Sequence, residues 1–402
     1  MIRRRRMRLY KGEFLDIFKS IIMLKVSKGG YVKEFEKEFA KYIKTKYAIA
    51  TCTGRNGLEL LLEALGLQEG DEVILPAYTL KDLVFLIKDR GFVPVLVDIK
   101  GDTFNIDPEL IQKAITPRTK VILATHIFGS PCMIEKIIEI AEKNNLVIIE
   151  DCAHAAGAEY NGQKVGSFGK AAFFSFETIK PVNTFGGGMV TTNDAEIAEY
   201  VKDEINGYPY KSIKVIFKIF YTYLEHFILH SPIYLFVALL FKFEIFKRII
   251  SGIYLSIHKG SRINQFRYSN LQGLIGLKQL KELDKKNTLR RKKAKDLIAF
   301  LNEDVTIQKV IPHAKPVYYF FVAKTSLHFN QARKKLLSKG VDTSTGSEIT
   351  DDCSRILSQH GCSMVEKTHM HAIQLPLYEE LKLRQIEYIA DSVNSINGNR
   401  RI

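Results

Sequence analysis

The chain has 402 residues, of which 46% are hydrophobic, so it can bury a large core and its length predicts two or three domains. Its formal net charge of +15 suits anionic or phosphate-bearing partners, but no nucleic-acid-binding signature accompanies the basic residues, so nucleic acid is not expected as a partner. The five scattered cysteines show no metal-ligand spacing and argue against a disulfide framework, which favours reduced thiols in a cytoplasmic protein.

The N-terminal segment, residues 1–27, is basic at first and then weakly apolar. Arginines occupy positions 3–6, and charged residues interrupt the apolar stretch at 14–26. No small-residue cleavage site follows, which argues against a secretory signal. We expect an amphipathic helix here instead.

Residues 28–205 are predicted to form a large domain, because short apolar runs alternate with helical patterns. The apolar runs predict strands at 47–51, 73–75, 94–98, 120–125, 146–150, 171–175 and 189–192. Helical spacing lies between them at 56–65, 81–88, 108–115 and 133–144. This alternation predicts an α/β fold with a mainly parallel seven-stranded sheet and helices on both of its faces.

After residue 205 the character of the sequence changes. Residues 206–262 are dense in Phe, Tyr, Ile and Leu punctuated by lysines, and we interpret them as an insertion. The longest uninterrupted apolar run in it, at 233–241, is far shorter than the roughly 20 residues that span a bilayer. The insertion therefore predicts association with a membrane surface and not a membrane span.

The C-terminal part returns to an ordinary globular pattern. Charged helical spacing predicts connecting helices at 263–302. A strand at 317–323 and helices near 331–339 and 385–396 then predict a smaller α/β domain at 303–402.

Ligands of parallel sheets collect at the carboxyl ends of the strands, and three polar segments lie at such ends. The first, residues 51–57, reads Thr-Cys-Thr-Gly-Arg-Asn-Gly between a predicted strand and a predicted helix. Its glycines let the backbone approach a ligand, and the amides of a helix start favour an anion such as phosphate. An ordinary strand-to-helix turn with a Thr or Asn cap is the alternative.

The second segment, residues 147–154, reads Val-Ile-Ile-Glu-Asp-Cys-Ala-His and ends an apolar strand in two adjacent carboxylates. Side chains alternate along a strand, so Glu150 and Asp151 face opposite ways. One of them at the mouth of the sheet is suited to pair with a cationic ring nitrogen or a metal. A helix cap or a salt bridge is the alternative.

The third segment carries Lys180, between an apolar strand at 173–176 and a triple glycine at 186–188. A partly desolvated lysine has a lowered pKa and can form a Schiff base with an aldehyde. A lone lysine is more often a surface residue, but the apolar strand before it and the glycines after it argue against that. Together the three segments supply the anion cradle, the carboxylate and the lysine that pyridoxal phosphate (PLP) requires.

The order of these segments resembles the DegT/StrS family of PLP-dependent aminotransferases, which act mostly on nucleotide-linked keto-sugars. The resemblance runs from about residue 29 to residue 396, apart from the insertion. It rests on Gly129, on the segments 150–158, 165–169 and 174–176, on Lys180, and on the segments 187–194 and 374–378. It implies a PLP fold-type I enzyme and a homodimer with shared active sites.

The resemblance also implies roles for single residues. Lys180 matches the lysine that binds the cofactor aldehyde, Asp151 the carboxylate on the pyridine nitrogen, and Ser175 a phosphate-binding hydroxyl. His154 stands where many members have a glutamine near the ring hydroxyl of the cofactor, and a histidine can donate there as well.

Some positions depart from the family pattern. Thr53, Gly54 and Arg55 match a Ser-Gly-Thr phosphate loop, in which the Arg55 guanidinium suits phosphate. Leu80 replaces the aromatic residue that usually stacks on the cofactor ring, with Tyr78 as a candidate substitute. Gln265 replaces an asparagine that in the family reaches the cofactor phosphate of the neighbouring subunit.

The resemblance implies the transfer of an amino group from an amino acid, glutamate or glutamine, to a nucleotide- or lipid-linked keto-sugar in surface polysaccharide or glycolipid biosynthesis. The nearest alternative is a PLP-dependent sugar dehydratase, which in this family has histidine in place of Lys180. A non-catalytic membrane-surface regulator that has kept the fold is the alternative from another class.

The insertion predicts where such an enzyme would bind a membrane. Residues 211–259 combine Phe, Tyr and Ile with lysines and few acids, which suits helices at the cytoplasmic surface of an anionic bilayer. The basic run at 3–6 and the stretch at 14–26 would add a second attachment point. Packing against the protein itself or a dimer mate is the alternative.

Overall fold

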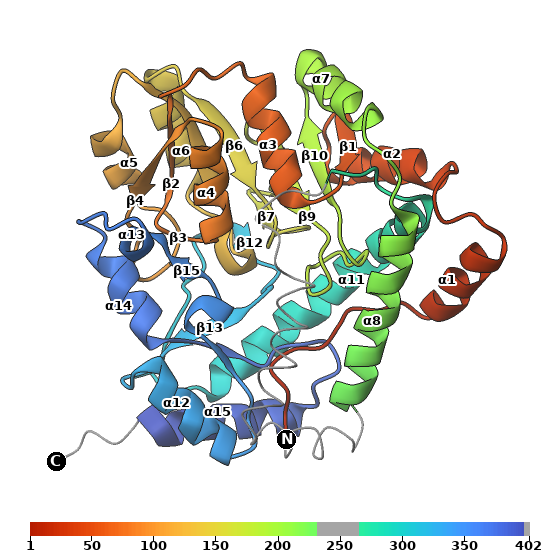
Figure 1. The fold of residues 1–402 in the computed structure, drawn as a ribbon. Coiled ribbons are helices and arrows are strands. Elements are labelled where there is room, and N and C mark those ends of the chain that lie inside the picture. The colour runs from red at the N-terminus through yellow and green to blue at the C-terminus, as the bar shows by residue number, and fades with distance from the viewer. Residues whose placement is uncertain (231–264, 398–402) are drawn as a thin grey trace, which may run out of the picture.

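A seven-stranded sheet forms the centre of the large domain in the computed structural model, which describes residues 1–230 and 265–397 (Figure 1). In spatial order the strands are β1 (Tyr47–Thr51), β10 (Gly188–Thr192), β9 (Ala171–Ser175), β6 (Val147–Asp151), β5 (Thr119–Thr125), β2 (Glu72–Pro76) and β4 (Val93–Val97). From β9 to β4 all neighbours pair in parallel, whereas β10 pairs antiparallel with β1 and β9. The predicted mainly parallel sheet is confirmed, and the predicted strands end within one residue of the observed ones.

Helices cover both faces of this sheet, as predicted. One face packs against α3 (Gly54–Ala64), α4 (Lys81–Asp89) and α7 (Ala195–Asn206). The other face packs against α2 (Tyr31–Ile43), α5 (Pro108–Ala114), α6 (Ile134–Lys143) and part of α11 (Asn270–Phe300). Because side chains alternate along a strand, Phe173 of β9 enters the first core and Phe174 the second.

The smaller C-terminal domain has its own sheet and its own core. Its strands, in spatial order, are β11 (Thr306–Ile307), β13 (Phe321–Lys324), β16 (Ala372–Leu375) and β14 (Ser344–Thr345). The core of this domain includes side chains from α12 (Phe329–Ser338), α15 (Leu383–Asn397) and the C-terminal end of α11. The helices α13 (Cys353–Ile356) and α14 (Ser363–His371) instead pack Cys353 and Val365 into the first core of the large sheet.

Two small sheets join the C-terminal part to the large domain. In one, β15 (Asp351–Asp352) pairs with β3 (Tyr78–Thr79), and in the other β12 (Ala314–Lys315) pairs with β7 (Glu159–Tyr160), which in turn pairs with β8 (Gln163–Lys164). These pairings bring loops of the smaller domain to the carboxyl ends of the large sheet.

The strand predicted at 317–323 is wrong at its N-terminal half. Only β13, from Phe321 onward, is extended, and residues 317–320 form a loop against the large domain. The carbonyl oxygens of Tyr318 and Tyr319 accept hydrogen bonds from Arg290, and the amide of Phe320 bonds to Phe128. Contacts distant in sequence therefore override the strand preference of the aromatic run.

Two helices project from one side of the molecule (Figure 1). The amphipathic helix predicted near the N-terminus is α1 (Glu13–Ile22), and it shares a small core with α8 (Ser212–His230) and the start of α11. Among the described residues, every helix is too short or too polar to cross a bilayer. The apolar run at 233–241 lies outside the described residues.

Candidate active site

Asp151 is the last residue of β6, so its carboxylate lies at the carboxyl end of the sheet. One carboxylate oxygen accepts the amide of Ala153 at 2.9 Å. Burial raises the pKa of Asp151, while the Ala153 amide and the nearby Lys180 and His126 oppose that rise. The carboxylate is thus buried and lies close to a cation.

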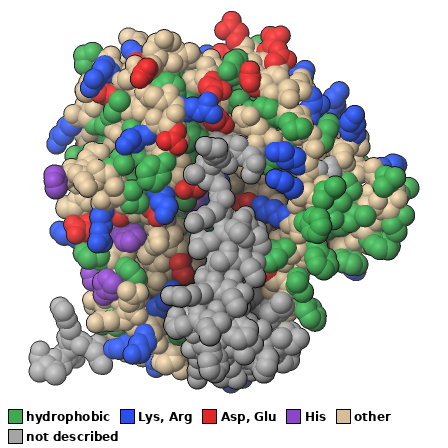
Figure 2. All heavy atoms as spheres, viewed as in Figure 1, with side chains coloured by type: hydrophobic (Ala, Val, Ile, Leu, Met, Phe, Trp, Pro, Cys, Tyr) green, Lys and Arg blue, Asp and Glu red, His purple; other side chains and the backbone are tan. Residues whose placement is uncertain are grey.

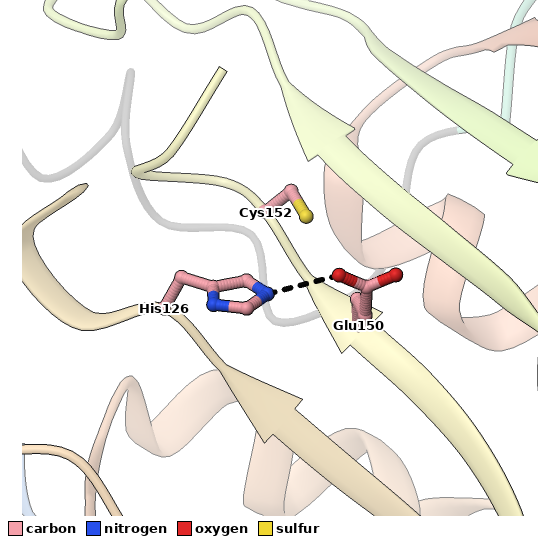
Figure 3. Close-up of side chains that lie close together, drawn as sticks. All are labelled: His126, Glu150 and Cys152. Carbon is pink, nitrogen blue, oxygen red and sulfur yellow. Dashed lines mark hydrogen bonds and ion pairs between the residues drawn. The ribbon is translucent and has the colours of Figure 1, made fainter. Parts of the chain in front are cut away.

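Glu150 points to the opposite face of the sheet, where it has a structural role. Its oxygens accept backbone amides of Gly166, Phe168 and Gly169 at 2.7 to 2.9 Å. A further contact of 3.1 Å joins it to Nε2 of His126, as Figure 3 shows. The alternation expected along this strand therefore leaves Asp151 as the carboxylate available to a ligand.

Figure 3 also places Cys152 beside His126 and Glu150, with the ligand atoms of all three within 4.8 Å of one another. The acid and the imidazole are occupied, because Glu150 accepts three amides and Nδ1 of His126 accepts the amide of Cys132 at 3.1 Å. A metal ion would have to displace these bonds. We interpret the cluster as a polar anchor that ties β5 and β6 to the loop at 166–169.

Lys180 lies in the turn that follows β9, as predicted. Burial lowers the pKa of its amine to about 8, although Asp151 and Glu177 pull in the opposite direction. Its Nζ lies 4.6 Å from the ring centre of Tyr319. The turn therefore holds an amine that is deprotonated far more readily than a surface lysine.

His154 contacts the same Tyr319 ring as this amine. Its ring stacks on Tyr319 with centroids 4.3 Å apart, and its Nδ1 accepts the amide of Phe128 at 3.3 Å. Burial and the charge of Lys180 lower its pKa well below the usual value, so the ring is neutral. Because Nδ1 is an acceptor, Nε2 carries the proton, and no group of residues 1–230 or 265–397 accepts it, so that it can donate to a ligand.

The predicted phosphate loop opens α3. The Thr53 hydroxyl caps this helix by accepting the amide of Asn56 at 3.0 Å. Gly54 packs so closely on β9 that a Cβ there would lie 3.1 Å from the Cβ of Ser175, so loop and hydroxyl adjoin. The first amides of a helix have no carbonyl partner within it, which suits an anion at this turn.

Arg55 is the member of this loop that is engaged elsewhere. Its guanidinium forms an ion pair with Asp82 of α4, and both side chains are partly exposed. A phosphate at the start of α3 would share this arginine with Asp82.

The two residues expected beside the cofactor ring, Leu80 and Tyr78, differ in exposure. Leu80 is 47% exposed at the start of α4. Tyr78 is buried in the core, where it meets Phe128 edge-on at a centroid distance of 5.9 Å. β3 is fixed by its pairing with β15, and the suggestion that Tyr78 replaces the stacking residue stays a prediction.

Gln265 lies in the irregular segment before α11 and is exposed. Within the described part of the chain it makes no hydrogen bond, and its contact with a neighbouring subunit stays a prediction. The structure thus brings Asp151, His154, Ser175, Lys180 and the Thr53 turn together, and leaves Leu80 and Gln265 facing outward.

Sequence reasoning missed three residues of this site. Tyr319 covers both Lys180 and His154, and Glu177 of the lysine turn pairs with Lys218 of α8 at 2.7 Å. Four consecutive aromatic residues at 318–321 do not follow the alternating pattern of a half-buried strand. This departure was the sequence signal that could have identified Tyr319 as a residue of the site.

Comparison with known proteins agrees with this geometry. Residues 13–210 match the DegT/DnrJ/EryC1/StrS aminotransferase family. The chain is 45% identical over 191 residues, 47% of its length, to the dTDP-3-amino-3,6-dideoxy-alpha-D-galactopyranose transaminase of Aneurinibacillus thermoaerophilus. It is 29% identical to the GDP-perosamine synthase of Escherichia coli O157:H7 over 93% of this chain and 92% of that one.

The coverage differs between these relatives. The first alignment spans about half, 53%, of the length of the Aneurinibacillus protein. The S. venezuelae protein DesV has a crystal structure that is similar over 97% of this chain and 95% of its own, with a TM-score of 0.76 at 25% identity. The likeness in fold therefore extends over nearly the whole of both chains.

Proposed function

Because the chain belongs to the DegT/DnrJ/EryC1/StrS aminotransferase family, we propose that it transfers an amino group from an amino acid to a keto-sugar. Family membership confirms the predicted resemblance, and the structural neighbour confirms the fold. The cofactor of this family is pyridoxal phosphate, as predicted. The observation that carries the proposed activity is the convergence of Lys180, Asp151 and His154 on one buried point.

The residues present fit this cofactor. Lys180 would hold its aldehyde, Asp151 its pyridine nitrogen, and His154 Nε2 its ring hydroxyl. The first turn of α3 with Thr53 and Gly54, together with Ser175, would hold its phosphate. When bound, the cofactor supplies an electron sink and carries the amino group from donor to acceptor.

The chain's own residues then manage protons and water. A pKa near 8 leaves roughly a tenth of the Lys180 amine deprotonated at pH 7, so Nζ can take a proton from a substrate carbon and return it. Asp151 keeps a proton on the ring nitrogen through charge. Tyr319 and His154 form a wall that excludes water from the amine.

The names of the relatives support a sugar as the acceptor, since they denote enzymes of dTDP-linked and GDP-linked amino sugars. Glutamate or glutamine is our proposed donor, and a nucleotide- or lipid-linked keto-sugar our proposed acceptor, in surface polysaccharide or glycolipid biosynthesis. Lys180 disfavours the dehydratase alternative. A buried amine with a lowered pKa disfavours a regulator that has lost its chemistry.

The test is to reduce the PLP-loaded protein with borohydride and map the labelled peptide. We expect the label on Lys180, and a label on Lys164 or Lys170 would overturn the assignment. A screen of nucleotide- and lipid-linked keto-sugars against the protein loaded with the aminated cofactor would then identify the acceptor.

We further propose that the protein is a homodimer and that it works at the cytoplasmic surface of a membrane. The support for the second point is an exposed apolar surface on α1 and α8, the α1–α8 face, which Figure 2 shows over α1 at the right of the view. It consists of Phe14, Leu15, Phe18, Ile22, Ile213, Phe217, Phe220, Leu224 and Phe227. The two helices touch through Phe14 and Tyr223.

The charges around the α1–α8 face suit anionic lipid. Lys11, Lys19 and Lys214 are exposed on it. The two acids of α1 are engaged within the protein, because Glu13 is buried and Asp16 accepts a hydrogen bond from Tyr10. An apolar surface edged by lysines is what an interfacial helix presents to a bilayer.

The basic run at 3–6 supports this attachment less than expected. Arg4 pairs with Glu348 at 2.8 Å and Asp342 at 3.5 Å, and Ile2 forms a bridge with Val341 of the smaller domain. This part of the N-terminal segment is thus bound to the fold, so we place the lipid contact on α1 and α8.

A further inference from the structure

A buried cluster of charges lies behind the active site, where three distant parts of the chain meet. Arg8 comes from the N-terminal segment, Arg290 from α11 and Glu379 from the turn after β16. One Glu379 oxygen lies 2.8 Å from Nη2 of Arg8 and 3.4 Å from Nε of Arg290. The three side chains are only 3%, 6% and 12% exposed, so this is a buried ion cluster.

Burial decides the pKa shift of one member of the cluster, and the neighbouring charges decide that of another. Burial and the charge of Arg290 lower the pKa of Arg8 to about 9, against the opposing effect of Glu379. Burial alone would raise the pKa of Glu379, but the charges of Arg290 and Arg8 outweigh it and lower that pKa to about 2. One carboxylate therefore balances the charge of two buried guanidinium groups.

Besides these ion pairs, both arginines donate hydrogen bonds to the backbone of the active site. Nη1 of Arg8 donates to the carbonyl of Pro181, the residue after Lys180, at 2.9 Å. Nη1 of Arg290 donates to the carbonyls of Tyr318 and Tyr319 at 2.9 and 3.1 Å. The cluster thus bonds to the lysine turn on one side and to the Tyr319 loop on the other.

Arg8 is itself held firmly in this place. Its carbonyl accepts hydrogen bonds from Asn183, in the lysine turn, and from Gln279 of α11. Its Nη1 also lies 3.3 Å from Oδ1 of Asn287. The N-terminal segment is therefore part of the wall of the active site.

Stability alone does not account for such a cluster. Desolvation of buried ions offsets most of their attraction, and apolar residues of similar size often fold as stably. What the charges add is direction, because a guanidinium donates along fixed axes to two acceptors at once.

We propose that Arg8, Glu379 and Arg290 are positioning residues that fix the Lys180 turn against Tyr319 and keep water from the amine. The proposal rests on the proposed function only in making Lys180 the reactive amine. Glu379 links the two arginines and through them the two loops. Without its charge one guanidinium turns toward water, and the loop that it holds moves with it.

The test compares two carboxylates that each bind two arginines. Glu379→Gln removes the buried one. The matched control is Glu348→Gln, because Glu348 lies 2.8 Å from Arg4 and 3.1 Å from Arg333 and also fastens the N-terminal segment, but at the surface. The acids that face Lys180, Asp151 and Glu177, are unchanged in both variants.

The readout is the reactivity of Lys180 in cofactor-free full-length protein toward an amine-specific reagent, mapped by peptide and followed against pH. In Glu379→Gln we expect the apparent pKa of Lys180 to rise from about 8 by about one unit, so its reactivity at pH 8 falls roughly fivefold. Glu379→Asp should restore part of the loss, and Glu348→Gln should match the wild type.

An unchanged profile in a folded Glu379→Gln protein would overturn the proposal and leave the cluster a purely structural role. If that variant does not fold, Arg290→Lys tests the proposal instead. A lysine there keeps the ion pair with Glu379 but cannot donate to the carbonyls of both Tyr318 and Tyr319. It should raise the Lys180 pKa as well, and a wild-type profile would be equally decisive against the idea. Because no cofactor is added, failure here is separate from failure of the borohydride mapping.

Discussion

The active site and the α1–α8 face depart from ordinary globular packing in opposite directions. The site buries charge, with Lys180 and Asp151 enclosed beside a neutral His154. The face exposes apolar rings, with Phe14, Phe217 and Phe220 each more than 65% exposed. Both arrangements cost free energy in the isolated chain. Each therefore indicates a partner: a cofactor in the first region and a covering surface in the second.

The two regions also differ in how they are encoded. The site is built from short segments at the carboxyl ends of β1, β6 and β9, so each polar residue has a place that strand geometry dictates. The face is shared by helices about 200 residues apart in sequence, and only their packing shows that it is one surface. Single substitutions should therefore change the reaction at the active site. Binding through the α1–α8 face should change only when residues on both helices are replaced.

The largest effect should follow from removing the amine. Lys180→Ala is expected to lower the transamination rate by more than about 10⁴-fold, because both the nucleophile and the proton carrier are lost. Single-turnover assays with the aminated cofactor supplied would measure it. A rate within tenfold of wild type would mean that another base carries the proton.

Asp151→Asn should have the next largest effect, on the order of 10² to 10³-fold in rate. Asparagine has the same shape and can keep the amide contact with Ala153, so the variant should fold, but it cannot hold a proton on the ring nitrogen by charge. The cofactor absorption spectrum and turnover report this together. Near-normal turnover would assign the task to another acid.

The parts of the site that could be predicted are those fixed by local sequence. Asp151 and Lys180 follow apolar strands, and the structure places both at the carboxyl end of the sheet. Alternation along β6 required Glu150 and Asp151 to differ, but it did not say which one the fold would use. The three amides that bind Glu150 come from a loop whose path the sequence does not reveal.

What could not be predicted depends on contacts between distant segments. Tyr319 reaches the site because Arg290 bends its loop out of the strand. Tyr78 is held in the core because β15, more than 270 residues later, pairs with β3. Arg8 looked like part of a basic tail and is instead a buried residue of the site wall. None of these pairings has a local signature.

A third prediction concerns the cost of burying Lys180. The folded pKa of about 8 lies below the ordinary value of 10.5, so between these values the unfolded chain binds more protons and stability rises with pH. Lys180→Met in cofactor-free protein should therefore be more stable than the wild type at pH 7, by at most about 3 kcal/mol. That advantage should shrink as the pH rises from 8 to 10.5.

Thermal unfolding of both proteins at pH 7 and pH 10 measures this difference. Lys170→Met is the control, because Lys170 is a surface lysine that pairs with Asp194. An equal melting temperature of wild type and Lys180→Met at every pH would show that water reaches the Lys180 amine in the free protein.

The smallest expected effect concerns the α1–α8 face. Phe18→Ser combined with Phe217→Ser removes one exposed ring from each helix, and each ring that leaves the bilayer interface forfeits roughly 1 kcal/mol or more of transfer free energy. Partitioning of the full-length protein onto vesicles with anionic lipid should fall about tenfold, and activity on a soluble acceptor should not change. Phe85→Ser is the control, since Phe85 is exposed on α4, away from this face.

Because the flanking lysines contribute by charge, wild-type binding should also weaken in high salt and on neutral vesicles. If the double variant binds vesicles like the wild type but sediments as a smaller species, the face is covered by a second copy of the chain and not by lipid.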